Sequence, residues 1–252
     1  MTNDINTELP TPIAVVHRKI PILAGVNQYQ SPFTQVIYVK SGVLSIITDS
    51  GRHFVPPTQA IAIPAQLSHE LLAKTEVELT LLSFESKPAE ILPDEIKVLS
   101  ISTFLKHLLD ECQSIDKHYL WHETPGRLLR LIRDYLACAP SLDIFLPYPK
   151  DPRLTNITEK LLKHPSLKSD LISWGKFVNA SSRTLTRIFK KETGITYSEW
   201  RQRLNIQIAI KHLAVGDSIS HIAKLLGYES SSAFIYMFKK QMGISPNQFL
   251  KS

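Results

Sequence analysis

Residues 181–196 read SSRTLTRIFKKETGIT, and residues 230–245 read SSSAFIYMFKKQMGIS. In each stretch two apolar residues lie four positions apart, namely Leu185 and Phe189 in the first and Phe234 and Phe238 in the second. Apolar residues at this spacing share one face of a helix, and a glycine commonly ends such a helix. The two stretches are therefore copies of one helical unit, which ends at Gly194 and at Gly243.

A short helix and a tight turn are expected upstream of each copy. Gly175 and Ala223 are small residues at the point where two helices would cross closely. Four positions later, Asn179 and Gly227 tolerate the positive φ that a tight turn requires. The N-caps of the following helices are expected at Ser181 and Ser230. A helix, a tight turn and a polar second helix form a helix-turn-helix, whose second helix enters the DNA major groove.

The two units are expected at about residues 170–191 and about residues 218–241, with an apolar helix from Trp200 to Ala214 between them. The charge balance agrees with a polyanionic partner. Residues 1–149 carry 12 Lys and Arg against 16 Asp and Glu, a balance of −4, whereas residues 150–252 carry 17 against 7, a balance of +10. Such asymmetry indicates two domains and a basic second one. Charge alone would also fit a lysine-rich surface that is simply exposed to solvent. The repeated helix-turn-helix pattern favours DNA as the partner instead.

The residue pattern of the N-terminal part of the chain predicts β-strands. Segments 35–40, 42–48, 60–63 and 77–84 are rich in β-branched, leucine and aromatic residues and are separated by turn residues. Strands at this spacing without helices between them indicate an antiparallel sandwich or a small barrel, here placed in residues 1–90.

Residues 91–149 are expected to be mostly helical. The apolar positions of the first predicted helix are Val98, Ile101, Phe104, Leu105, Leu108 and Leu109. Those of the second are Leu128, Leu129, Ile132 and Leu136, after a Thr124-Pro125 helix start. These helices either pack on the β-domain or mediate dimerisation. The proline-rich segment 146–152 is expected to be the linker to a C-terminal domain at residues 150–252.

Several classes of protein are excluded or disfavoured by the sequence. No apolar run approaches the roughly 18 residues that cross a bilayer, and residues 1–11 lack the features of a signal peptide. Cys112 and Cys138 do not make a disulfide framework or a zinc-finger pattern. The chain contains no GxSxG, P-loop or HExxH motif. We therefore expect a cytoplasmic protein with no membrane association, no cofactor and no enzymatic activity.

The C-terminal 100 residues resemble the DNA-binding domain of the AraC/XylS family of bacterial transcription regulators. The matching runs are Asp151-Pro-Arg-Leu, residues 181–194, Trp200-Arg-Gln-Arg-Leu, Ala209, residues 222–228 and residues 234–246. The resemblance implies two helix-turn-helix units that read successive major grooves of double-stranded promoter DNA. For the whole chain we expect a homodimer formed through the N-terminal domain and its helices, a small-molecule effector in that domain, contact with RNA polymerase and association with the nucleoid.

The family pattern assigns DNA contacts position by position. The side chains expected to face the bases are Ser182, Arg183, Thr186 and Arg187 in the first recognition helix, and Ser231, Ser232, Ile235 and Tyr236 in the second. Those expected to contact phosphates are Lys190, Lys191, Lys239 and Lys240. Those expected to pack inward are Leu185, Ile188 and Phe189. Arginine suits guanine because its planar fork meets O6 and N7 together, although a solvated or phosphate-bound arginine is the alternative.

Two departures from the family pattern affect these assignments. Tyr236 stands where relatives often carry arginine, so we predict asymmetric readout. Arg183→Ala or Arg187→Ala should relax specificity more than Tyr236→Ala does. Asn205 stands where relatives usually carry arginine in the linking helix, which leaves a structural ion pair there in doubt.

Residues 13–85 resemble the cupin-like sensor domain of such regulators. Glycines and prolines of the two cupin motifs are present, but Tyr29 and Ser31 occupy positions where related proteins often have histidine. Only His69 remains of the metal-binding set, and Gln35 replaces the acid, so no metal is expected. His53 is expected at the surface. The candidate effector-binding residues are Tyr29, Ser31, Gln35, Tyr38 and His69.

The sequence thus predicts a two-domain α+β chain. A cupin-like antiparallel β-barrel with a helical linker precedes an all-α domain with two helix-turn-helix motifs, and together they form an activator or repressor. Two alternatives remain: a cupin-type metal enzyme with a basic appendage, and a ligand-independent DNA-binding protein whose barrel only dimerises.

Overall fold

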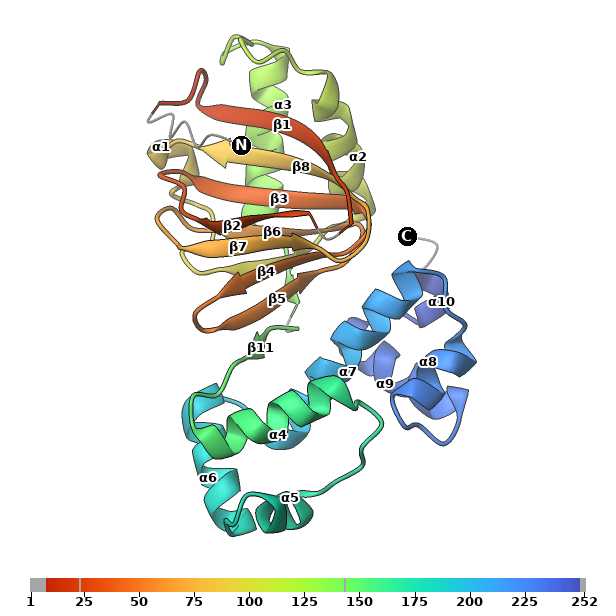
Figure 1. Cartoon of the computed structure of the whole chain (residues 1–252). Helices are drawn as coiled ribbons and strands as arrows, with labels where there is room; N and C mark the ends of the chain where they lie inside the picture. Colours follow the sequence, from red (N-terminus) through yellow and green to blue (C-terminus); the bar gives the residue numbers. More distant parts are fainter. Residues whose placement is uncertain (1–7, 23, 143, 250–252) are drawn as a thin grey trace. The chain divides into compact units, whose positions relative to one another are not determined.

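The computed structural model describes residues 8–22, 24–142 and 144–249. The chain divides into two compact units: unit 1 contains residues 1–48 and 53–143, and unit 2 contains residues 49–52 and 144–252. Unit 1 is rich in strands and unit 2 is helical (Figure 1). This confirms the predicted two-domain α+β architecture, with the division at residues 143 and 144.

The strands form two antiparallel sheets. In spatial order the first sheet contains β1 (Ile13–Ile20), β8 (Val77–Phe84), β3 (Thr34–Ser41), β6 (Gln59–Ile63), β9 (Lys97–Ser100) and β10 (Ser141–Leu142). The second contains β11 (Leu146–Pro147), β5 (Gly51–Val55), β4 (Leu44–Thr48), β7 (His69–Ala73) and β2 (Gly25–Tyr29). All four predicted strands are present, as β3, β4, β6 and β8. Among the described residues no strand pairing joins the two sheets, so the expected barrel is two separate sheets.

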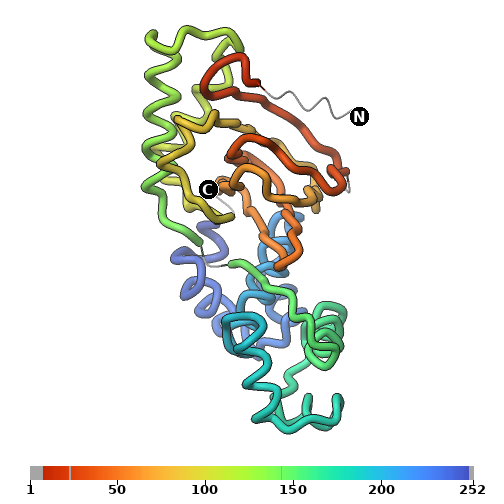
Figure 2. Tube along the Cα trace, turned by 90° about the vertical axis from the view of Figure 1, so that its left-hand side faces the viewer, coloured from red at the N-terminus to blue at the C-terminus, as the bar shows by residue number. Residues whose placement is uncertain are grey.

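One face of the first sheet is covered by α2 (Thr103–Glu111) and α3 (Thr124–Ala137). Alternate residues of β3, Val36 and Tyr38, point to this face and are buried with Leu129 and Ile132 of α3. Figure 2 shows α3 alongside the strands of unit 1. Of the two roles considered for these helices, packing on the β-domain is therefore confirmed. The short helices α1 (Ser86–Ala89) and η1 (Cys112–Ser114) complete this unit.

Three residues of unit 1, Val98, Ile101 and His53, are placed differently from expectation. Val98 belongs to strand β9, not to a helix, and Ile101 follows that strand as a loop residue. A four-residue strand is too short for the period of its apolar residues to distinguish it from a helix. His53 is buried rather than at the surface, with 3% of the residue exposed. Cys112 is buried, Cys138 is exposed, and neither forms a disulfide.

Unit 2 is an assembly of short helices around one long one. The helices are α4 (Pro152–Lys163), α5 (Leu171–Phe177), α6 (Ser182–Thr193), α7 (Tyr197–Ala214), α8 (Ile219–Leu225), α9 (Ser231–Met242) and α10 (Pro246–Phe249). Thr196 and Glu199 start α7 with a capping box. No helix in the described part of the chain is long and apolar enough to cross a membrane.

The proline-rich segment expected to be a linker is part of the unit 2 core. Leu146 is fully buried with Leu154 and Trp200, and Pro147 accepts a hydrogen bond from the Trp200 indole nitrogen at 2.9 Å. Leu146 and Pro147 also pair with residues 51–52 as strand β11. Apolar residues that meet a buried tryptophan are held in place, so the segment is ordered despite its prolines.

Candidate nucleic-acid interface

The two helix-turn-helix units share one turn geometry. In the first unit, the Ala180 amide donates to the Gly175 carbonyl at 2.9 Å, and Asn179 has a φ of 52°. In the second, the Tyr228 amide donates to the Ala223 carbonyl at 2.8 Å, and the corresponding φ is 78° at Gly227. A Cβ added to Gly175 would collide with the Ala180 carbonyl oxygen. The repeat predicted from sequence is therefore a repeat of structure.

Both recognition helices are capped as predicted. The hydroxyl of Ser181 accepts from the Thr184 amide at 3.1 Å, and the hydroxyl of Ser230 accepts from the Ala233 amide at 3.2 Å. Each satisfies an amide that has no partner within its own helix. Gly194 and Gly243 end the helices in the left-handed conformation, with φ of 72° and 75°. Sequence positions 181–194 and 230–243 thus define α6 and α9 closely.

The inward faces of the two helices are apolar and fully packed. Leu185, Ile188 and Phe189 of α6 are buried with Trp174 and Trp200, as predicted. The rings of Phe189 and Trp200 meet edge to face, with centroids 6.0 Å apart. On α9 the buried residues are Phe234, Phe238 and Met242. Because these faces are buried in the core of unit 2, the opposite faces of α6 and α9 are exposed to solvent.

The outward face of α6 carries two exposed arginines. Arg183, Thr186 and Arg187 are exposed, and Ser182 is half-buried. Within the described residues, neither arginine forms a hydrogen bond or an ion pair. Thr186 donates its hydroxyl hydrogen to the Ser182 carbonyl at 2.9 Å, so in this rotamer it offers only acceptor lone pairs outward. The outward face of α6 therefore presents two guanidinium groups, which are hydrogen-bond donors, one helical turn apart.

The outward face of α9 is less charged. Ser232 is exposed and Tyr236 is 72% exposed, whereas Ser231 and Ile235 are half-buried. The structure thus places the predicted residues of each helix on one surface, with hydroxyl and apolar groups on α9 where α6 has guanidinium groups.

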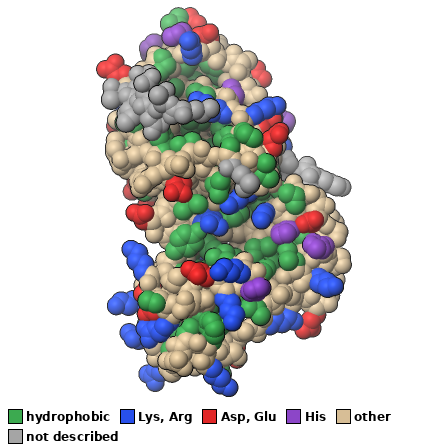
Figure 3. All heavy atoms as spheres, viewed as in Figure 1, with side chains coloured by type: hydrophobic (Ala, Val, Ile, Leu, Met, Phe, Trp, Pro, Cys, Tyr) green, Lys and Arg blue, Asp and Glu red, His purple; other side chains and the backbone are tan. Residues whose placement is uncertain are grey.

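Lysines end both recognition helices. Lys190 and Lys191 occupy the last turn of α6, Lys239 and Lys240 the last turn of α9, and all four are exposed. Lys and Arg side chains gather over the lower part of the surface in Figure 3, which is unit 2. Exposed ammonium groups beside a recognition helix are suited to contact phosphate oxygens. Such contacts fix the position of a protein on DNA but do not select the base sequence.

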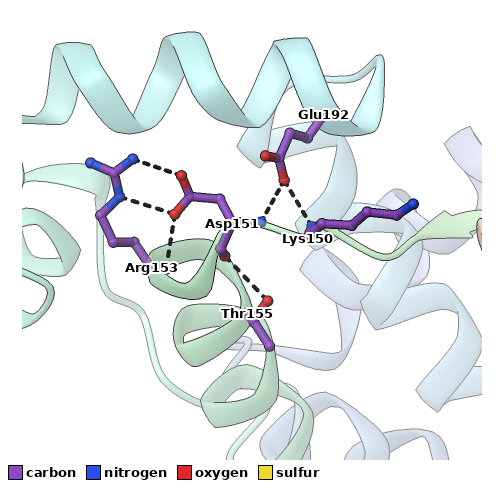
Figure 4. Close-up of polar contacts among 5 residues, drawn as sticks. All are labelled: Lys150, Asp151, Arg153, Thr155 and Glu192. Atoms are coloured by element: carbon purple, nitrogen blue, oxygen red, sulfur yellow. Dashed lines mark hydrogen bonds and ion pairs between the residues drawn. The ribbon is translucent and has the colours of Figure 1, made fainter.

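The start of α4 is hydrogen-bonded to α6 through Glu192 (Figure 4). One carboxylate oxygen of Glu192 accepts from the backbone amides of Lys150 and Asp151, both at 2.8 Å. Asp151 caps α4 and pairs with Arg153 at 2.6 Å, and the Arg153 hydrogen bond lowers the pKa of the Asp151 carboxyl. Sequence reasoning missed Glu192, because its partners lie about 40 residues earlier in the chain.

Helix α7 contacts both helix-turn-helix units. Near its start, Trp200 lies under α6, and Arg201 donates to the carbonyls of Pro165 and Leu167 in the loop between α4 and α5. Gln202 accepts from Gln241 of α9 at 2.7 Å. Asn205, where an ion pair was in doubt, donates instead to the Tyr228 hydroxyl at 3.2 Å. One helix therefore sets the distance between the two recognition helices.

The candidate effector residues of unit 1 do not all converge. Tyr29 and His69 are opposite each other on β2 and β7, with ring centroids 5.7 Å apart. Gln35 is buried and donates to Ser83 at 3.5 Å. Tyr38 lies on the other face of β3 from Gln35, against α2 and α3. Alternation along the strand separates Tyr38 from the rest.

Ser31 and His69 are both buried polar residues near the end of β2. The Ser31 hydroxyl accepts from the Phe33 amide at 3.1 Å, and its carbonyl accepts from the Gln66 amide at 2.7 Å. His69 Nδ1 is 2.8 Å from the Leu67 carbonyl oxygen, whereas Nε2 has no partner among the described residues. Burial lowers the pKa of His69, so the neutral ring offers Nε2 as an unused acceptor.

The chain is similar to known regulators over most of its length. The family described as Helix-turn-helix domain matches residues 174–252. Identity to the HTH-type transcriptional regulator NimR of Escherichia coli (strain K12) is 30% over 234 residues, which covers 91% of this chain and 85% of NimR. Identity to the HTH-type transcriptional regulator RipA of Corynebacterium diphtheriae is 33% over 104 residues, 41% of this chain and 30% of RipA. Among solved structures, apo ToxT from Vibrio cholerae has a TM-score of 0.42 at 12% identity, over 96% of this chain and 98% of that chain.

Proposed function

Because this chain belongs to the AraC/XylS family of helix-turn-helix transcription regulators, we propose that it reads a two-block operator in promoter DNA, with α6 in one major groove and α9 in the next. The observation that carries this proposal is the exposed pair Arg183 and Arg187, which have no hydrogen-bond or ion-pair partner in the described part of the chain, on a helix whose other face is buried. Ser182 and Thr186 supply further base contacts, and the block read by α6 is the more specific one.

On α9 we assign Ser231, Ser232, Ile235 and Tyr236 to the second block. The serines suit either bases or phosphates, and Ile235 suits a thymine methyl group. We assign the phosphate contacts beside the two blocks to the lysines in the last turns of α6 and α9, namely Lys190, Lys191, Lys239 and Lys240. Base discrimination in this block is therefore weaker than in the first.

The test is selection from a random DNA duplex pool with the full chain, followed by anisotropy titration across salt concentrations. The expected result is a motif with two blocks about one helical turn apart, bound roughly 10³-fold or more tightly than random DNA. A steep salt dependence without a motif would mean that unit 2 only neutralises phosphates. Absence of any DNA binding by the folded chain would refute the proposal.

Unit 1 is the proposed effector-binding domain. The supporting observation is the buried Nε2 of His69, which has no partner among the described residues and lies on the same strand pair as Tyr29. A small molecule with a hydrogen-bond donor, held near Ser31 and Gln35, would satisfy that acceptor. Tyr38 is the weakest of the five candidates, since it faces the helices.

A thermal-shift screen of metabolites separates this proposal from the ligand-independent alternative. A metabolite that stabilises the wild type but not His69→Phe supports an effector site. A folded unit 1 that responds to no metabolite supports a domain that only dimerises. We infer no catalytic function for unit 1.

The outer face of α2 and α3 is the proposed homodimer surface. Phe104 and Tyr135 are about half exposed with ring centroids 5.2 Å apart, and Leu131 lies one turn from Tyr135. The double variant Phe104→Glu, Tyr135→Glu should sediment as a monomer under conditions where the wild type is a dimer. A dimer that survives both substitutions would place the interface elsewhere. At the promoter, in the cytoplasm and nucleoid of a bacterium, the regulator is then proposed to contact RNA polymerase.

A further inference from the structure

Three side chains with metal-binding groups converge where α7 leads into α8. His212 lies in the last turn of α7, Asp217 in the connecting loop and His221 in the first turn of α8. One nitrogen or oxygen from each lies within 4.8 Å of the other two. His212 Nδ1 is 2.6 Å from an oxygen of Asp217, and the two imidazole centroids are 6.4 Å apart.

The backbone between these residues is fixed by its own hydrogen bonds. Gly216 has a φ of 86°, which allows the sharp turn, and its amide donates to the Leu213 carbonyl at 3.0 Å. The amide of Asp217 donates to the His212 carbonyl, also at 3.0 Å. Ser218 caps α8 by accepting from the His221 amide at 3.2 Å. The ligand-bearing positions are therefore ordered before any ligand binds, which lowers the entropic cost of binding.

We propose that His212, Asp217 and His221 form a binding site for a divalent transition-metal ion of the Zn²⁺ type. Two imidazoles and one carboxylate are ligands that such ions prefer, whereas Mg²⁺ and Ca²⁺ favour sites made of oxygen atoms alone. Tetrahedral Zn²⁺ with bonds of about 2.0–2.1 Å would bring the imidazole centroids to about 5 Å. The observed 6.4 Å is longer than that value, and we expect rotation of the exposed His221 side chain to bring the two rings closer. A water molecule fills the fourth position.

A metal ion at this site would tie the end of α7 to the beginning of the second helix-turn-helix unit. Its ligands come from both helices and from the loop between them, so binding requires the loop to keep its present shape. The ion therefore stabilises unit 2 whether or not DNA is present. None of the three ligands belongs to the proposed base-reading or phosphate-binding set, and the inference stands independently of that proposal.

The test is calorimetric titration of the untagged full chain with Zn²⁺, together with thermal unfolding. The matched control is His164→Gln, since His164 is an exposed histidine of the same unit outside the cluster. We expect one equivalent of Zn²⁺ to bind the wild type and the control. Binding should be at least tenfold weaker in His221→Gln, whose exposed side chain can be changed without loss of the fold, and in Asp217→Asn.

Zn²⁺ should also raise the unfolding temperature of the wild type and the control but not that of His221→Gln. Circular dichroism without metal confirms that each variant is folded. Equal Zn²⁺ affinity in the wild type and His221→Gln would overturn the proposal, as would the absence of a one-equivalent binding event in the wild type.

Discussion

Replacement of Arg187 by alanine should weaken operator binding and erase the base preference at one position of the first block. Arg183 and Arg187 are four residues apart on the exposed face of α6, which is about 6 Å along the helix axis. With a base-pair rise of about 3.4 Å, the two side chains reach bases about two steps apart. Each bidentate arginine–guanine contact contributes about 1–3 kcal/mol of discrimination. The expected loss for each alanine variant is therefore between about 5-fold and 150-fold, at separate positions.

The assay is an anisotropy titration of each variant on the operator and on its single-base substitutions. Arg187→Lys keeps the positive charge but loses the planar fork, so it should retain the salt dependence without the base preference. Lys190→Ala serves as the phosphate control. It should weaken binding to all sequences alike and reduce the salt slope by about 1.

Two results would refute this reasoning. One is full recovery of base preference in Arg187→Lys, which would make Arg187 a phosphate contact. The other is an equal loss of affinity in Arg183→Ala, Arg187→Ala and Tyr236→Ala, because the polar but uncharged outer face of α9 predicts a smaller effect for the last variant.

Three further outcomes follow from the structure. The buried indole nitrogen of Trp174 donates to the Tyr197 hydroxyl at 2.7 Å. Tyr197→Phe removes this partner and should lower the free energy of unfolding of unit 2, measured by urea titration, by about 1–3 kcal/mol. No change would mean that water replaces the hydroxyl. Burial lowers the pKa of His53 from 6.5 to about 4. As the pH falls, the unfolded chain therefore binds a proton at this histidine before the folded chain does. The contribution of His53 to the free energy of unfolding of unit 1 is thus fully present above about pH 6.5 and decreases toward pH 4. At pH 5 the loss should be about 2 kcal/mol relative to pH 7.5 in urea unfolding, and the same loss in His53→Gln would assign it to other groups. Insertion of five base pairs between the operator blocks turns them to opposite faces of the DNA. The affinity measured by anisotropy titration should then fall to that for a single block. An unchanged affinity would show that the two recognition helices move independently.

The local features of the helix-turn-helix units were predictable because each depends on neighbours in sequence. The cap at Ser181, the left-handed residue Asn179 and the terminating Gly194 are all within a few residues of the groups that they serve. Their chemistry is readable without tertiary information. The repeat raised the specificity of the prediction, since two copies seldom share this pattern by chance.

Features that depend on distant partners were not predictable in the same way. Glu192 meets amides at Lys150 and Asp151, and no local pattern marks such a pair. His53 is buried although its sequence neighbourhood contains turn residues. The place of Tyr38 could have been found, since Gln35 and Tyr38 differ by an odd number of positions on one strand and must face opposite sides.

The contacts of α7 constrain how an effector could control DNA binding. The helix makes an aromatic contact to α6 through Trp200 and side-chain hydrogen bonds to Gln241 and Tyr228. A change in the distance between the recognition helices would break several of these interactions, and each half-buried hydrogen bond of this kind contributes about 0.5–1.5 kcal/mol. Allosteric coupling between sites typically amounts to only 1–3 kcal/mol in total, and a ligand can shift an equilibrium only by its differential affinity for the two states. If an effector binds unit 1 as proposed, changing that distance would therefore take up most of a typical coupling free energy. We therefore expect regulation to act on unit 2 as one body, through its availability to DNA or through the pairing of two copies at adjacent sites.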